Sequence, residues 1–381
     1  MKHGNVKNEI AASGNRVASI DALRGFDMFF IMGGAELIMS ICALWPNSTL
    51  ARVLTRQMIH VDWNGLRFYD YILPLFLFVA GLSFPFSLHR QRETGIDDRF
   101  ILLRVLKRSI LLILLGFIYN GFQYGWTLNP ADFRFASVLG RLGIAWGIAA
   151  ALFTKLRRRD VLIIGIAILV LYWICVGMLP RALGLGNPFT IDENLVARID
   201  RHLIPGRLYF GTYDPEGLVA AIPSVVTVLS GMMSSSFLAL SPVSSDDNHR
   251  LRDHLIAALT LLVLGMVWGI VFPINKSMWS SSFVCVTSGI SMILFTIFYY
   301  LIDICGNKRA VFPLRVIGMN AITIYLAQAI LSPGWIINGV FGRFINQFPD
   351  VWSEIIIWSI YVLLCWLFLY LLYRRKIFLK V

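Results

Sequence analysis

The sequence predicts an all-α integral membrane protein, a polytopic bundle of about ten transmembrane helices with both termini in the cytoplasm. The first observation is composition: of 381 residues, 57% are hydrophobic and 15% charged, and mean hydropathy is +0.70. Soluble domains are about a quarter charged. The second is a series of apolar runs, each near the length of a membrane span. The third is that basic residues gather in alternate connections between these runs.

A helix needs about 20 predominantly apolar residues to cross a hydrocarbon layer about 30 Å thick. The stretches of this length are 22–45, 68–89, 101–121, 135–154, 160–180, 217–239, 253–273, 280–303, 314–332 and 352–373. The first has its long apolar run after Arg24 and no cleavage site behind it, so we expect a retained helix rather than a secretory signal. The expected organisation is a cytoplasmic tail, 1–18, followed by one transmembrane domain, 19–381.

The connections predict the orientation. One set is short and basic, and its longest basic run is Lys155 to Arg159. The alternate set is longer and poorer in Lys and Arg, and comprises 46–67, 122–134, 181–216, 274–279 and 333–351. The positive-inside rule places the basic set in the cytoplasm and the alternate set outside. The net charge of +12 then reflects topology, so we expect no nucleic-acid partner.

One short segment in the first outer loop combines unusual chemistry. His60, Asp62, Trp63, Asn64 and Gly65 stand between two apolar runs. Histidine is suited to proton transfer because its reference pKa is about 6.5. An interfacial histidine satisfied by a backbone carbonyl is the alternative. The five cysteines are scattered without a CxxC pair, so we expect neither a metal site nor a disulfide framework.

Several charged residues fall inside the predicted spans. Asp21, Arg24 and Asp27 share roughly one helix face, Asn120 ends the third span and Arg141 lies in the fourth. Such residues are costly in lipid and normally face a cavity or a partner. Both an ion pair that fixes packing and a ligand-binding role are open at this point.

The chain resembles the heparan-alpha-glucosaminide N-acetyltransferase family, including bacterial relatives, within the transmembrane acyltransferases. The matching residues are 19–25, 60–66, Asp70, Pro74, 76–81, Arg134, 138–143, 199–201, 213–217, 273–280, 318–320 and 372–378. Each segment is a weak signal alone, but together they keep the order expected for the family among the expected helices. The resemblance covers nearly the whole chain after residue 17.

The resemblance implies an enzyme that moves acetyl from cytosolic acetyl-CoA to the amine of a terminal glucosamine beyond the membrane. It identifies His60, in the family's His-x-x-Trp-Asn-Gly stretch, as the catalytic residue. We expect a donor site within the bundle, open to the cytosol, for which the candidates are Arg24, Arg104, Lys107, Arg108, Asn120 and Arg141. For the single basic residues, topology and anionic lipid headgroups are the alternative.

Acyl transfer to an amine requires removal of a proton, stabilisation of a tetrahedral oxyanion and exclusion of water. His60 serves as general base or as transient acetyl acceptor. Asp62 or Asp70 orients its ring, and Asn64, Asn275 or Lys276 holds the oxyanion. The expected acceptor contacts are Trp63, Asp214, Glu216, Asn275, Lys276 and Trp279. The alternatives are a helix-start turn for 214–217 and a membrane-interface anchor for Trp279.

Two other functions stay open from the sequence. One is an O-acyltransferase of an envelope glycan, because amine and hydroxyl acceptors need similar sites. The other is a multi-pass transporter of a small sugar or anion, which buried charges would also suit. The expected location is a bacterial inner membrane, and the expected partners are acetyl-CoA, a glycan acceptor and the lipid bilayer, with a homodimer left open. No metal is expected.

Overall fold

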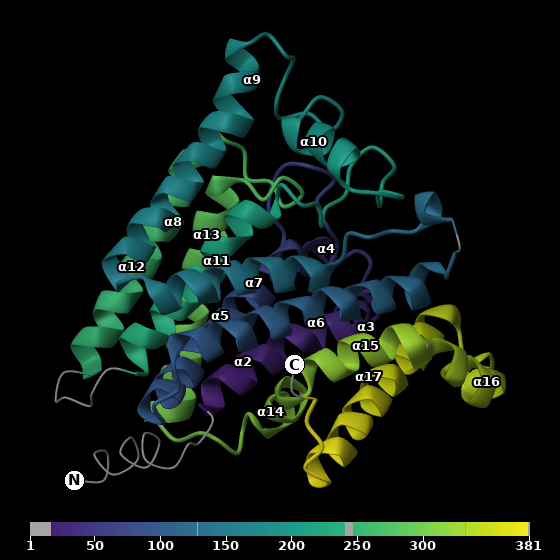
Figure 1. Cartoon of the computed structure of the whole chain (residues 1–381). Coiled ribbons are helices and arrows are strands. Elements are labelled where there is room, and N and C mark those ends of the chain that lie inside the picture. Colours follow the sequence, from purple (N-terminus) through teal and green to yellow (C-terminus); the bar gives the residue numbers. More distant parts are fainter. Residues whose placement is uncertain (1–16, 128, 241–246, 332, 380–381) are drawn as a thin grey trace.

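The computed structural model is built from helices and describes residues 17–127, 129–240, 247–331 and 333–379 (Figure 1). The predicted tail, 1–18, lies almost wholly outside these residues. The first half contains α2 (Ala18–Phe29), η1 (Phe30–Gly34), α3 (Ala35–Cys42), α4 (Thr49–Gln57), α5 (Phe68–Glu93), α6 (Asp98–Tyr124), η2 (Pro130–Asp132), α7 (Val138–Lys155), α8 (Arg158–Trp173), η3 (Ile174–Met178) and α9 (Leu179–Ala182). The second half contains α10 (Leu195–Leu203), α11 (Ala221–Leu238), α12 (Asp247–Trp268), α13 (Ser281–Phe298), η4 (Tyr299–Ile304), α14 (Phe312–Met319), α15 (Ala321–Leu331), α16 (Pro333–Ile345) and α17 (Asp350–Arg374).

The described helices include 8 that are long and apolar enough to cross a membrane, or up to 9 if the bent pair α14 and α15 is one span. Within the described residues, helices cover most of each of the ten predicted stretches. The difference from the predicted count concerns α6, which covers the stretch 101–121. Its first half carries Arg104, Lys107 and Arg108, and this helix is not among the apolar spans of the described residues. The chain is therefore a multi-pass integral membrane protein with a smaller set of purely apolar spans than predicted.

Two of the spans are interrupted. The first breaks inside η1, where Met32 and Gly33 leave helical geometry and Gly33 adopts a φ of 104°. Only glycine takes such a φ readily, and a Cβ added there would meet the ring of Tyr361 at 3.1 Å. The second break lies between α14 and α15, whose axes are bent by 68°. These breaks place irregular backbone inside the bundle, where protein rather than lipid covers it.

Two pairs of glycines bring helices into backbone contact. A Cβ on Gly25 of α2 would lie 1.8 Å from the Leu314 carbonyl oxygen of α14, and one on Gly318 would lie 1.8 Å from the Asp21 oxygen. Gly81 of α5 and Gly231 of α11 repeat this arrangement, with distances of 2.2 and 2.1 Å to opposing carbonyls. Close approach at small residues is how membrane helices gain packing energy without a hydrophobic driving force.

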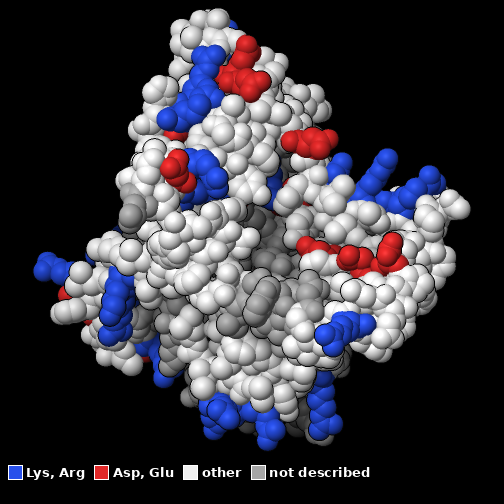
Figure 2. Space-filling model, turned by 90° about the vertical axis from the view of Figure 1, so that its right-hand side faces the viewer, with Lys and Arg blue, Asp and Glu red and all other residues white. Residues whose placement is uncertain are grey.

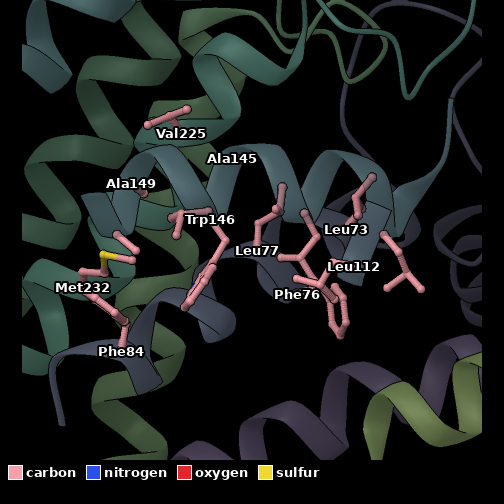
Figure 3. Close-up of a cluster of buried hydrophobic side chains, with 14 of the residues drawn as sticks. Leu73, Phe76, Leu77, Phe84, Leu112, Ala145, Trp146, Ala149, Val225 and Met232 are labelled. Atoms are coloured by element: carbon pink, nitrogen blue, oxygen red, sulfur yellow. The ribbon is translucent and has the colours of Figure 1, made fainter. Parts of the chain in front are cut away.

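The main core lies where α5, α6, α7 and α11 meet (Figure 3). Side chains from all four helices interdigitate, among them Leu77, Leu112, Trp146 and Met232. By contrast, only 17% of the apolar part of α12 and 11% of that of α17 are buried. Most of the surface drawn in Figure 2 carries no charged side chain, and basic groups mark its lower edge. The exposed apolar helices are those that lipid would cover.

Four of the five loops predicted to lie outside meet at one end of the bundle. The Gly65 N–H donates to the Ile274 carbonyl at 2.8 Å, and the Trp63 indole donates to the Phe189 carbonyl at 2.7 Å. An isolated bridge pairs Arg134 with Gly206. The fifth loop, 333–351, is largely the helix α16. Which side of the membrane this end faces stays a prediction from the basic residues.

Candidate functional site

The segment between α4 and α5 is held in place by its own ends. The Gln57 side chain accepts from the Phe68 N–H at 2.8 Å, and the Arg67 guanidinium donates to the His60 carbonyl at 2.6 Å. Gly65 has a φ of 123°, a conformation that favours glycine. These contacts fix the backbone on both sides of His60 and leave its ring at the surface of this loop.

The His60 ring is paired with a buried carboxylate. Its Nδ1 lies 2.7 Å from Asp70 Oδ1, and the two side chains are 51% and 1% exposed. Asp70 stands in the first turn of α5, where its other oxygen accepts the N–H groups of Val61 and Arg67 at 3.1 and 3.2 Å. The carboxylate therefore both caps the helix and fixes the ring, which leaves Nε2 as the nitrogen available for chemistry. Asp62 is exposed and makes no hydrogen bond within the described residues.

The ammonium of Lys276 lies against the same ring. Its Nζ is 3.2 Å from His60 Nδ1, 3.3 Å from Nε2 and 3.8 Å from Asp70 Oδ1. The ammonium is thus nearly equidistant from the two ring nitrogens. Burial lowers the pKa of Lys276, and the charges of Asp70 and Glu216 oppose that shift. The site thus combines an imidazole, a carboxylate and a cation within hydrogen-bonding distances.

Asn275 and Trp279 hold the loop that carries Lys276. The Asn275 amide donates to the Trp63 carbonyl at 3.0 Å and to Asn64 Oδ1 at 3.1 Å, and its oxygen accepts the Met278 N–H at 2.8 Å. Trp279 is 0% exposed and adopts a φ of 51°, which is unusual for a bulky residue. Both side chains are buried, and their contact with an acceptor stays a prediction.

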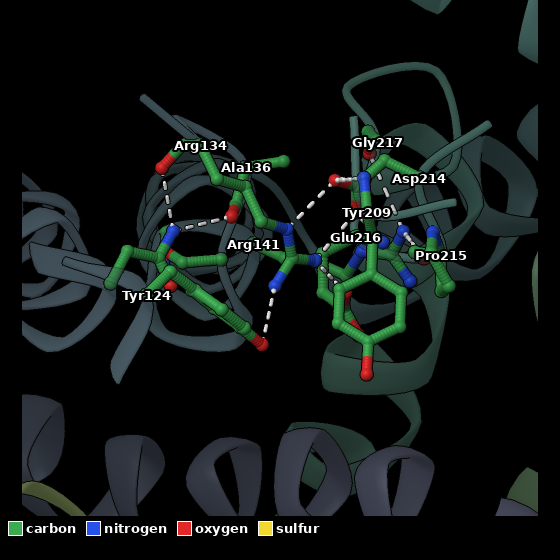
Figure 4. A network of polar contacts seen from close by, with 12 residues as sticks. Tyr124, Arg134, Ala136, Arg141, Tyr209, Asp214, Pro215, Glu216 and Gly217 are labelled. Carbon is green, nitrogen blue, oxygen red and sulfur yellow. Dashed lines mark hydrogen bonds and ion pairs between the residues drawn. The ribbon is translucent and has the colours of Figure 1, made fainter. Parts of the chain in front are cut away.

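A second polar network lies beside this loop (Figure 4). The Arg134 guanidinium donates to both oxygens of Asp214, at 2.9 and 2.7 Å, and also to Glu216. Burial opposes the charged form of Arg134, but hydrogen bonding to Asp214 and the charge of Glu216 raise its pKa. Tyr209 covers the guanidinium at 4.6 Å. The Asp214 side chain is buried and that of Glu216 is 13% exposed, and an acceptor contact for either stays a prediction.

Two residues predicted to bind the donor, Asn120 and Arg141, contact this network. The Asn120 amide donates to the Arg134 and Ala136 carbonyls at 2.8 and 2.7 Å, so its role here is to hold the chain before α7. Arg141 is 2% exposed, donates to the Pro215 carbonyl and stacks over the Trp279 ring at 4.8 Å. Both lie among the loops that surround His60, away from the other candidates.

The remaining donor candidates separate into an inward and an outward group. Arg24 pairs with Asp21 at 3.0 Å and donates to Ser83 Oγ at 2.7 Å. Arg108 lies over the Trp146 ring at 4.1 Å, close enough to Arg24 for their charges to repel. Arg104 and Lys107 are exposed on α6. Only Arg24 and Arg108 therefore face the interior of the bundle.

Two side chains that the sequence did not single out for the site contribute to it. The Tyr69 ring lies 4.8 Å from the His60 ring, between centroids, and Arg134 organises the second network. Tyr69 precedes Asp70 in an apolar run, and nothing in that run distinguishes it from core aromatics. Arg134 had a weak signal as a lone basic residue in an outer loop. Trp63 is half-buried, with its indole N–H on the Phe189 carbonyl and its edge against Tyr213 at 5.2 Å.

Comparison with curated proteins gives two relatives, the heparan-alpha-glucosaminide N-acetyltransferases of human and mouse. The human protein is 26% identical over 390 aligned residues, covering 84% of this chain and 55% of the human protein. The mouse protein is 25% identical over 448 residues, covering 97% of this chain and 61% of its own. The chain thus spans between 55% and 61% of the length of these relatives. No family model matches.

Proposed function

From the relation of this chain to the heparan-alpha-glucosaminide N-acetyltransferases, which confirms the resemblance seen in its sequence, we propose that it is a membrane-embedded N-acetyltransferase. It moves acetyl from cytosolic acetyl-CoA to the amine of a glucosamine-type sugar on the extracytoplasmic side. The observation that carries this proposal is the His60–Asp70 pair at 2.7 Å with Lys276 against the ring. These three groups match the needs of acyl transfer.

In the proposed reaction, His60 Nε2 removes a proton from the attacking amine because Nδ1 is occupied by Asp70. The new C–N bond forms at the thioester carbon, and the negative charge on its oxygen is stabilised by the Lys276 ammonium. Collapse breaks the C–S bond, and the proton held by His60 passes to the leaving thiolate. Alternatively, Nε2 attacks the thioester itself and carries the acetyl to the amine in a second step. The same geometry serves both routes.

Acceptor contacts are proposed for the partly exposed groups around the imidazole. Glu216, Asn64 and the exposed edge of Trp63 offer a carboxylate, an amide and an aromatic ring, which together suit hydroxyls and the C–H face of a sugar. Asp62 is exposed close by along the chain and is assigned to acceptor binding rather than to orienting the ring. An envelope glycan in a bacterial inner membrane is the acceptor context we propose.

The donor phosphates are proposed to lie at the opposite end of the bundle. Arg24 and Arg108 face the interior there, and within the described residues only Asp21 forms an ion pair with either. Two cations with one carboxylate leave a positive site, which suits a phosphate group. The basic loops predict that this end faces the cytosol.

The test uses purified protein in detergent with labelled acetyl-CoA and a panel of sugars. We expect transfer to glucosamine-terminated fragments and none to fragments whose amine is already acetylated. His60→Ala should abolish transfer while preserving the melting temperature. His202 is an exposed histidine at the same end, and His202→Ala should retain transfer. Transfer to the acetylated fragments would point to a hydroxyl acceptor, and undiminished turnover by His60→Ala would refute the assigned base.

A further inference from the structure

One side of α6 is apolar and open to the surroundings of the protein. Along it, Phe100 is 61% exposed, Leu103 60%, Leu114 49% and Ile118 39%. Together with Lys107 and Leu111, which is 38% exposed, they recur every three or four residues and so lie on a single stripe. Because the chain is a multi-pass membrane protein, lipid is what covers such a stripe.

The stripe begins in a basic surface pocket. This pocket of about 540 Å³ is lined by the turn 95–97 and by Phe100, Leu103, Arg104 and Lys107. Arg104 is held by the Gln91 side chain at 2.7 Å, which steadies one edge of the guanidinium and leaves its charge unneutralised. Within the described residues, neither cation forms a salt bridge. The acid of the pocket, Asp97, caps α6 through the Arg99 N–H at 2.9 Å.

The dimensions of α6 place this pocket at the edge of the hydrocarbon layer. From Lys107 and Arg104 to its last residue, Tyr124, the helix rises about 26 Å and about 30 Å at 1.5 Å per residue, close to the ~30 Å of a typical core. The two cations therefore lie near the level of the headgroups. From Lys107 to Ile118 the stripe extends about 16 Å, close to half of the layer.

We infer that this pocket binds the phosphate of an anionic phospholipid, whose acyl chain lies along the exposed stripe of α6. Charge complementarity favours an anionic headgroup, because two cations face one carboxylate that is already used as a helix cap. The length of the stripe matches the chain of one leaflet. This inference does not depend on the proposed acetyl transfer.

The pocket is distinct from the inward-facing charges proposed for the donor. Arg108 packs on Trp146 of α7 inside the bundle, whereas Lys107 is exposed next to it in the chain. Neighbouring residues on a helix differ by about 100° in direction, so one basic cluster in the sequence serves two surfaces. The phosphate of a lipid and the phosphates of a soluble donor would thus lie on opposite sides of α6.

The test compares lipid retention by variants of the full chain. Protein is equilibrated in detergent with equal amounts of phosphatidylglycerol and phosphatidylcholine, and bound lipid is counted by native mass spectrometry. We expect the double variant Arg104→Gln, Lys107→Gln to lose retained phosphatidylglycerol on the order of tenfold, given the usual effect of two interfacial cations. Arg104→Lys with Lys107→Arg should retain it. Arg159→Gln, an exposed basic residue on α8, is the matched control.

A second arm distinguishes the two sources of phosphate by titrating coenzyme A into the same samples. Unchanged lipid retention in the double glutamine variant would overturn the inference. Loss of coenzyme A affinity in that variant, with lipid retention intact, would also overturn it and return Arg104 and Lys107 to the donor site. Equal loss in Arg159→Gln would show nonspecific attraction of charge and would overturn it as well.

Discussion

Replacing Asp70 with Asn tests whether His60 needs the Asp70 carboxylate to take part in acetyl transfer. The contact to Nδ1 is short, at 2.7 Å, and the carboxylate is 1% exposed. An amide in its place removes the charge that stabilises the ring after it takes a proton. An amide nitrogen turned toward Nδ1 would also favour the wrong tautomer, as in the serine-protease triad. The Lys276 ammonium would lose its partner at 3.8 Å at the same time.

We expect kcat to fall by about 10²- to 10³-fold, with little change in the KM for acetyl-CoA. General-base help is usually worth about 10²–10⁴-fold. We choose the lower part of that range because the ring is 51% exposed, so water can replace part of the lost stabilisation. The loss corresponds to about 3–4 kcal/mol of barrier height.

The assay is steady-state transfer by purified protein, with Asp192→Asn as the matched control because that carboxylate of the loop 181–216 is exposed and makes no hydrogen bond within the described chain. The double variant of His60→Ala and Asp70→Asn should be no slower than His60→Ala alone, since the pair acts as a unit. Turnover of Asp70→Asn within about threefold of wild type, or losses that multiply in the double variant, would refute the reasoning.

Three further predictions concern other parts of the chain. Gly231→Ala should lower stability by about 1–3 kcal/mol, because its Cβ would meet the Phe78 oxygen at 2.1 Å, whereas Gly339→Ala, in open space, should leave the melting temperature unchanged. Arg108→Gln should raise the KM for acetyl-CoA about tenfold, as expected for one lost charged contact to phosphate, but not that for the acceptor; equal effects on both would indicate a folding role. A tag inserted after residue 50 should be accessible from outside the cell while both termini are protected, and labelling from the cytoplasmic side would show an inverted topology.

Much of the fold could be predicted because length and hydropathy control which segments become membrane helices. The prediction was weakest for a helix that combines apolar and charged residues. In α6 the cations Arg104 and Lys107 leave the hydrophobic length short, and composition alone does not say which of them faces lipid. The breaks at Gly33 and between α14 and α15 depend on tertiary packing, such as Tyr361 against Gly33, which periodicity does not report.

The site could be predicted in part for a similar reason. His60, Asp70 and Lys276 stand out as titratable groups near the ends of apolar runs, and the fold brings them together across more than two hundred residues of sequence. The residues that hold these three groups in place were harder to predict from the sequence. Asn275 and Trp279 carry the same polar and aromatic atoms that a sugar site would use, and only their burial shows that those atoms hold the loop. Arg141 has the chemistry of a phosphate ligand, but its neighbours are the carbonyls of the turn 215–217.

The helix α5 joins the two ends of the proposed reaction. Its first turn holds Asp70 against the imidazole, and Ser83 of the same helix accepts from Arg24. At 1.5 Å per residue, these two points are separated by about 20 Å along the axis. Gly81 packs this helix closely against the backbone of α11, which holds these two points in fixed positions. A donor whose phosphates bind near Arg24 can reach His60 with its acyl carbon only if a long and narrow part of the donor connects the two. A donor analogue in which this connecting part is shortened should therefore still bind but not transfer its acyl group.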